Sequence, residues 1–161
     1  MSKEIVEKLS KVRVDSSTIL NTLRGMEETQ RSRGLSLATT SLEKGRMYLG
    51  EIQGNLGEEF PYETTKTATT AKEIQKAVEV SGKVLPIDSN EILNLNRLRE
   101  AITIKIEEIL ECVMWFATEH KVGNLEDKFV RDSNIAEAYR SYKETRMWLG
   151  VRLGEIKSTQ G

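Results

Sequence analysis

Arginines that stand near hydroxyl and aromatic residues are the side chains best suited to chemistry in this sequence. Arg31 and Arg33 precede a predicted helix that carries Thr40 seven residues, or two turns, after Arg33. Guanidinium groups beside hydroxyls and the free N–H groups of a helix start can bind phosphate. A second cluster of the same types lies inside a longer predicted helix, without free N–H groups, and consists of Arg99, Thr103 and Lys105. The sequence therefore predicts two phosphate-binding positions.

Three aromatic residues and one further arginine extend this hypothesis. Aromatic faces can stack on nucleobases, with about 1–3 kcal/mol per base, and the candidates are Tyr48, Trp115 and Trp148, with Arg146 two residues before Trp148. The alternative interpretation is that the aromatic side chains pack in a core or an interface and that the arginines are solvated.

Acidic residues raise the possibility of an enzyme. The run EEILE puts Glu107, Glu108 and Glu111 within about one helical turn, and carboxylates in this spacing can hold Mg²⁺. The run resembles the first half of the signature of all-α nucleoside triphosphate pyrophosphohydrolases of the MazG type. The second ExxD pair of that signature has no counterpart, and the other explanation is a solvated acidic helix face. We therefore expect no catalytic residue, metal or cofactor.

A single Cys and a single His exclude several kinds of chemistry. Cys112 has no partner for an intrachain disulfide, and its apolar neighbours predict a buried thiol in a reducing compartment. His120 alone cannot complete a usual Cys/His zinc site, and its surroundings indicate a helix end, where histidine interacts well with the last carbonyl groups.

Charge and hydropathy limit the partners. The 161 residues include 24 Lys and Arg against 25 Asp and Glu, for a net charge of -1, so DNA or RNA binding along a basic face is not expected. No apolar run approaches the roughly 20 residues of a membrane span. We expect a soluble, unprocessed protein in the cytoplasm.

The spacing of apolar residues is helical almost throughout and predicts an all-α fold. Capping residues at 15–17 predict two short helices, or one with a joint, at the start, and Gly34 is predicted to cap their end. From Ala38 to Leu56, apolar residues and Gly45 recur at steps of three and four and form one face of the next predicted helix, a seam for packing against another helix. Further helices are predicted to start at Thr70 with Glu73, at Asp88 with Glu91, and near Asp132. We divide the chain into segments 1–33, 34–62, 63–124 and 125–161 of one compact domain.

An internal repeat links two of these segments. Residues 38–50 read ATTSLEKGRMYLG and residues 138–150 read AYRSYKETRMWLG, without a gap. Matched Arg46 and Arg146, with matched Gly50 and Gly150, go beyond what packing periodicity requires, so we infer a repeated helical unit forming hairpins. Because the two seams resemble each other, we expect them to pair between subunits in a homo-oligomer.

The string RSRGLSLATTSLEKGRMYLGE resembles the helical hairpin domain of small phage proteins that sequester cyclic nucleotide signals, the anti-CBASS and anti-Thoeris sponges. The matching positions are Arg33, Leu37, Ala38, Thr40, Leu42, Glu43, Met47 and Tyr48. A middle copy keeps Arg99, Ala101, Thr103, Ile106, Glu107, Met114 and Trp115, and a third keeps Glu144, Met147 and Trp148.

The resemblance implies a function without catalysis. It implies an oligomer of helical hairpins that binds a cyclic oligonucleotide or a cyclic ADP-ribose derivative and does not cleave it, in the cytoplasm of an infected bacterial host. The implied ligand-binding residues are Arg31, Arg33, Thr40, Tyr48, Arg99, Thr103, Lys105, Trp115, Arg146 and Trp148. The alternatives are the pyrophosphohydrolase described above and a helical interaction protein without a ligand.

Overall fold

The computed structural model describes residues 3–30, 32–55, 84–85, 89–118 and 125–160. In these residues the chain forms four α helices and no strand, so the predicted all-α class is confirmed. The helices are α1 (Lys3–Thr29), α2 (Arg33–Asn55), α5 (Glu91–Thr118) and α6 (Leu125–Gln160).

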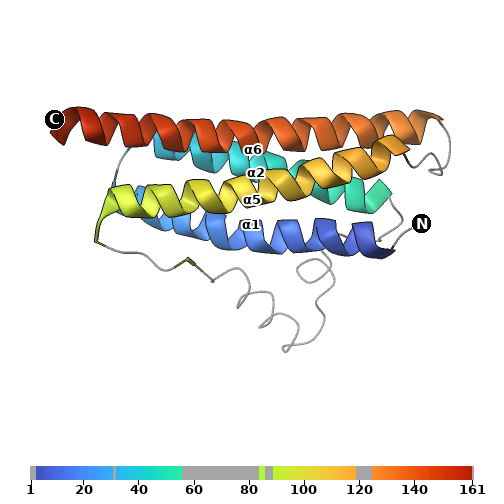
Figure 1. Ribbon diagram of the computed structural model, residues 1–161, viewed down its shortest axis with the longest axis horizontal. Coiled ribbons are helices and arrows are strands. Elements are labelled where there is room, and N and C mark those ends of the chain that lie inside the picture. The colour runs from blue at the N-terminus through green and yellow to red at the C-terminus, as the bar shows by residue number, and fades with distance from the viewer. Residues whose placement is uncertain (1–2, 31, 56–83, 86–88, 119–124, 161) are drawn as a thin grey trace.

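The four helices lie alongside one another as a bundle (Figure 1). Helices α1 and α6 run in one direction, and α2 and α5 run in the other. Helix α1 packs on α2 and α5, and α6 packs on the same two helices. Each helix therefore has two antiparallel neighbours, and α2 is joined to the parallel, diagonally placed α5 by a long connection, as in bundles with one crossover.

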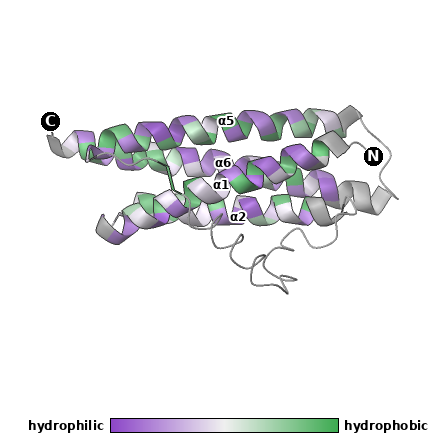
Figure 2. Ribbon diagram, turned by 90° about the horizontal axis from the view of Figure 1, so that it is seen from below, coloured by the Kyte–Doolittle hydropathy of each residue, from purple (hydrophilic) through white to green (hydrophobic). Residues whose placement is uncertain are grey.

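Apolar residues at helical spacing bury one face of every helix and form a single core. Apolar and polar residues are interspersed along each helix (Figure 2), as expected for helices that present only one stripe to a core. The buried hydrophobic residues with no exposed surface at all include Leu9, Leu23, Leu42, Leu49, Leu95, Ile102, Ile109, Tyr142 and Leu149.

The predicted joint in the first helix is wrong, because α1 continues without interruption from Lys3 to Thr29. Ser16 is fully buried inside it. Its hydroxyl donates to the Val12 carbonyl at 2.5 Å and lies 2.6 Å from the hydroxyl of Tyr142, on the opposite side of the bundle. A residue type that favours a helix start is thus satisfied inside the helix by its own backbone and by a tertiary partner.

Gly34 was predicted to cap a preceding helix, and this is wrong because it lies in the first turn of α2. A Cβ at Gly34 would lie 3.2 Å from the Trp148 carbonyl oxygen, and one at Gly45 would lie 2.6 Å from the ring of Tyr142. Gly34 therefore lets the backbone of α2 come close to that of α6, and Gly45 makes room for the Tyr142 ring. The α2–α6 contact is the most extensive in the bundle.

Two helix starts differ from the predicted ones. Asn90 caps α5, because its side-chain oxygen accepts a hydrogen bond from the Leu93 N–H at 3.2 Å. Asp88 lies outside the described residues, as do Thr70 and Glu73. Helix α6 begins at Leu125 instead of near Asp132. Asp132 lies inside the helix, where it pairs with the buried Arg131.

The two segments of the predicted repeat lie on α2 and α6 and have closely similar burial. Ala38, Leu42 and Leu49 are buried in α2, as are the residues 100 positions later in α6. Because these seams pack on each other within one chain, they no longer supply a reason for two subunits to pair. A common origin of the segments and a homo-oligomer both stay predictions.

Candidate functional site

Two predicted ligand-binding arginines come together on the α5–α6 face. Arg99 projects from α5, and its guanidinium atoms lie 3.7–3.9 Å from the position that a Cβ on Gly150 would occupy. Arg146 projects from α6, and its Nη1 donates to the hydroxyl of Thr103 at 3.2 Å. Since both arginines line the same two neighbouring hollows, they form a cationic ridge between them, which we call the Arg99–Arg146 ridge.

The hydroxyl of Thr103 holds this arrangement. It donates its proton to the Arg99 carbonyl at 2.8 Å and accepts from Arg146. Thr103 was predicted to bind ligand directly, whereas in this geometry its single proton is used by the backbone and it positions Arg146. The Nε of Arg99 is buried and has no hydrogen-bond partner within the described part of the chain, so it is not exposed to a ligand in either hollow.

The hollows on the two sides of the ridge differ in chemistry. The first, on α5, has a volume of about 880 Å³. Besides the two arginines and Thr103, it is lined by Asn96, Glu100 and Ile104. The second, on α6, has a volume of about 510 Å³. Besides the two arginines it is lined by Tyr139, Arg140, Lys143, Glu144, Met147 and Gly150. Both hollows are open to solvent, so a ligand can enter them without displacing a helix.

Three residues of the second hollow were missed by the sequence analysis. Lys143 Nζ lies 5.2 Å from the centre of the Tyr139 ring, and Arg140 pairs with Glu137 at 2.5 Å. The signal was present in the sequence, because positions 139, 143 and 146 follow one another at helical spacing. It was overlooked because the third repeat copy lacks the leading arginine and threonine of the motif.

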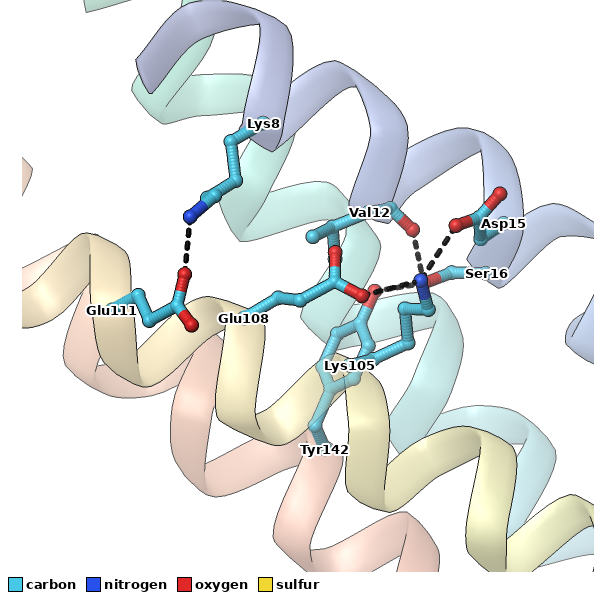
Figure 3. Close-up of polar contacts among 8 residues, drawn as sticks. All are labelled: Lys8, Val12, Asp15, Ser16, Lys105, Glu108, Glu111 and Tyr142. Carbon is cyan, nitrogen blue, oxygen red and sulfur yellow. Dashed lines mark hydrogen bonds and ion pairs between the residues drawn. The ribbon is translucent and has the colours of Figure 1, made fainter. Parts of the chain in front are cut away.

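Lys105, a third member of the predicted cluster, lies in the bundle interior and is occupied (Figure 3). Its Nζ donates to Asp15 at 2.5 Å and to Glu108 at 2.8 Å. Burial alone would lower the pKa of Lys105, but the hydrogen bonds and charges of Asp15 and Glu108 outweigh it and raise the pKa. Lys105 therefore joins α1 to α5 and does not line either hollow beside the ridge.

Of the three carboxylates proposed as an alternative Mg²⁺ site, two form ion pairs with lysines and the third is exposed. Glu108 pairs with Lys105, and Glu111 pairs with Lys8 of α1, while Glu107 is exposed (Figure 3 shows the two pairs). No group of three or more His, Cys, Asp or Glu side chains is placed to hold a metal ion in the residues that the structure describes.

Cys112 is fully buried, as predicted, and burial raises the pKa of its thiol to about 12. A thiol with such a pKa is a poor nucleophile at neutral pH. His120 lies outside the described residues.

The first predicted phosphate-binding cluster lies elsewhere. Arg33 is exposed and lines a separate hollow of about 390 Å³ with Glu27, Ser32 and Ser36. Thr40 does not line that hollow, and its hydroxyl donates to the Ser36 carbonyl at 3.1 Å. Arg31 lies outside the described residues. The structure thus does not bring Arg33 and Thr40 together around one ligand position.

The three aromatic side chains proposed for base stacking pack against the hydrophobic core. Tyr48, Trp115 and Trp148 are each partly buried there, and Trp115 meets Phe116 edge to face with ring centres 5.3 Å apart. None of the three lines a hollow beside the Arg99–Arg146 ridge. The aromatic residue that does so is Tyr139.

No protein-family model, curated protein or solved structure matches this chain. Among the described helices, none combines the length and the apolar character that crossing a membrane would require.

Proposed function

We propose that this protein binds a cyclic nucleotide signal at the Arg99–Arg146 ridge and sequesters it without cleaving it, in the cytoplasm of an infected bacterial cell. The observation that carries the proposal is the pair of guanidinium groups lining two hollows together. Like charges that line the same hollows repel each other, and a phosphate that bridges them reduces the repulsion while accepting charge-assisted hydrogen bonds.

Comparison with the matching segment of α2, residues 38–50, supports placing the ligand on α5 and α6. Arg46 of α2 corresponds to Arg146, and its Nε donates to the Arg13 carbonyl at 3.3 Å. The residues that correspond to the cationic Arg140 and Lys143 are Thr40 and Glu43. The α6 face thus gains Arg140 and Lys143 relative to α2, while the change from Lys44 to Glu144 offsets part of this gain in positive charge.

The second hollow supports a ligand with more than one phosphate. Lys143 offers a further cationic group beside the ridge, Arg140 is paired with Glu137, and the hollow also holds the carboxylate of Glu144. Tyr139 with Met147 offers apolar surface. A cyclic oligonucleotide carries phosphates joined by sugars and bases, so one phosphate can occupy the ridge while another approaches Lys143. Lysine and arginine side chains bind and orient phosphates, and this chemistry supports holding a ligand more directly than it supports cleaving one.

Isothermal titration calorimetry with cyclic dinucleotides, cyclic trinucleotides and cyclic ADP-ribose analogues tests the proposal. We expect tight binding of at least one of them by the wild type. Replacing Arg146 or Arg99 by alanine should weaken the affinity about ten- to a hundredfold, because a hydrogen bond to a charged group contributes about 1.5–3 kcal/mol. Arg46→Ala is the matched control and should change the affinity less than twofold.

Three outcomes would contradict the proposal in different ways. If none of these compounds binds, the function is wrong. If Arg46→Ala weakens binding as much as Arg146→Ala, the location is wrong. If mass spectrometry recovers a converted product from the complex instead of the intact ligand, the protein is an enzyme and does not sequester its ligand.

A further inference from the structure

The first hollow contains a carboxylate that a pure anion site would not need. Glu100 lines it together with the two arginines of the ridge, yet within the described residues it forms no ion pair with either of them. A free carboxylate beside a phosphate position weakens anion binding by repulsion. Its presence is favourable only when the ligand also brings hydrogen-bond donors to this place.

Glu100 belongs to a stripe on α5 that fits a nucleobase. Asn96, Glu100 and Ile104 follow at steps of four, so they lie in a row on one face of the helix. All three line the first hollow. Ile104 is 53% exposed, and a flat heterocycle lying on it would cover apolar surface. The row therefore offers an apolar face and two polar groups for the edge of a base.

We propose that this hollow selects guanine, with Glu100 as the residue that determines the choice. The inference rests on the proposed function. An ionised carboxylate accepts two hydrogen bonds side by side, and guanine presents two neighbouring donors, N1–H and the N2 amino group, on its Watson–Crick edge. The amide N–H of Asn96, one turn away, is suited to donate to guanine O6. The phosphate attached to the same nucleotide then lies on the Arg99–Arg146 ridge.

The same geometry rejects adenine. Adenine has an acceptor at N1 where guanine has a donor, so its N1 lone pair would face the Glu100 carboxylate. Glu100 is exposed in the free protein, and a base lying over it would cover both acceptors, so the mismatch discriminates more strongly than a missing apolar contact does. We therefore expect at least about a tenfold preference for guanine, the effect of one charge-assisted hydrogen bond.

The test measures calorimetric affinities for cyclic dinucleotides that carry two guanines, one guanine and one adenine, or two adenines. The wild type should prefer the two-guanine compound over the two-adenine compound at least about tenfold. Glu100→Gln should reduce this preference below about threefold, because the amide replaces one acceptor by a donor and removes the charge. The affinity for the adenine compound should rise or stay constant in this variant.

Glu107→Gln is the matched control. Glu107 is an exposed carboxylate on the same helix that does not line the hollow, so its removal changes the helix charge equally without touching the base. This variant should keep the preference of the wild type. Because Glu100 is exposed, both variants should retain the thermal unfolding midpoint of the wild type.

The outcomes separate this inference from the function on which it rests. Tight binding of all three compounds with equal affinity overturns the guanine selectivity and leaves the proposed function standing. A preference that survives Glu100→Gln overturns the role of Glu100. No binding of any cyclic nucleotide overturns the proposed function and the selectivity together.

Discussion

Replacement of Lys105 by methionine distinguishes a structural from a ligand-binding role for this residue. The side chain of Lys105 is 8% exposed and bonds Asp15 and Glu108, whose side chains are 38% and 16% exposed. Methionine keeps most of the apolar stem that Lys105 buries. The substitution therefore removes the ammonium group and leaves two carboxylates without it.

The expected cost follows from the exposure of each carboxylate. Glu108 is mostly buried, and leaving it unpaired should cost about 2–3 kcal/mol. Asp15 is more than one third exposed, so water replaces much of what it loses, and its share should stay below about 1 kcal/mol. We expect Lys105→Met to lower the free energy of unfolding by about 3 kcal/mol.

Urea unfolding followed by helical circular dichroism measures this change, with the denaturant slope serving as a check that the folded state is the same. The double variant Lys105→Met with Glu108→Gln removes the unpaired charge and should recover at least about 1 kcal/mol. The affinity for cyclic nucleotides should not change in either variant. A loss of stability below about 1 kcal/mol would refute the reasoning, and so would a tenfold loss of affinity in the folded single variant.

Three further predictions concern packing, titration and capping. Gly45→Ala should lower the free energy of unfolding by about 1–2 kcal/mol, because its Cβ would lie 2.6 Å from the ring of Tyr142. Gly154→Ala, whose Cβ would have no neighbour within 4 Å in the described part of the chain, should raise it by about 0.5–1 kcal/mol. Changes of the same sign in denaturant unfolding would contradict this contrast. Burial raises the pKa of Cys112 from 9.0 to about 12. Above about pH 9 the thiol of the unfolded chain therefore loses its proton while the folded thiol keeps it, and the free energy of unfolding falls with rising pH, by about 1.4 kcal/mol at about pH 10. Cys112→Ala should remove this part of the pH dependence in urea unfolding, and parallel pH profiles of the two proteins would refute it. Asn90→Ala removes the acceptor for the Leu93 N–H and should cost about 1 kcal/mol in thermal unfolding, whereas an unchanged midpoint would show that the cap contributes nothing.

The helices of this protein could be predicted from the sequence because the core is built from regular stripes. Leu95, Leu98, Ile102, Ile106 and Ile109 recur at steps of three and four, and all are buried. Such a period fixes the type of element and the face that turns inward.

Helix boundaries were predicted less well, because capping residues are ambiguous in a sequence. Ser16 and Asp132 belong to residue types that favour helix starts, but in the structure both lie inside helices. Ser16 is satisfied by Val12 and Tyr142, and Asp132 by Arg131. Val12 and Arg131 are local partners, but the Tyr142 hydroxyl and the burial of Arg131 come from the tertiary packing, which a sequence read locally does not reveal.

The candidate site was predicted in part. Arg99, Thr103 and Arg146 were singled out from residue type, and the structure joins them in one place although Thr103 and Arg146 are 43 positions apart. Tyr139 and Lys143 were missed. Lys105 was chosen for the same reason as Arg99, and only its position on α5 relative to α1 shows that it is occupied by Asp15 and Glu108.

The sequence by itself determined the all-α class, the inward stripes and the supply of arginines, since these depend on periodicity and composition. The tertiary structure decided which arginines share a space. Helix α6 lies between α2 and α5 because close approach at Gly34 and Gly45 brings α2 against it on one side. Gly150 then leaves room for Arg99 of α5 on the other side. A chain can specify each helix through local spacing, but the distance between two side chains on different helices depends on how the whole bundle packs.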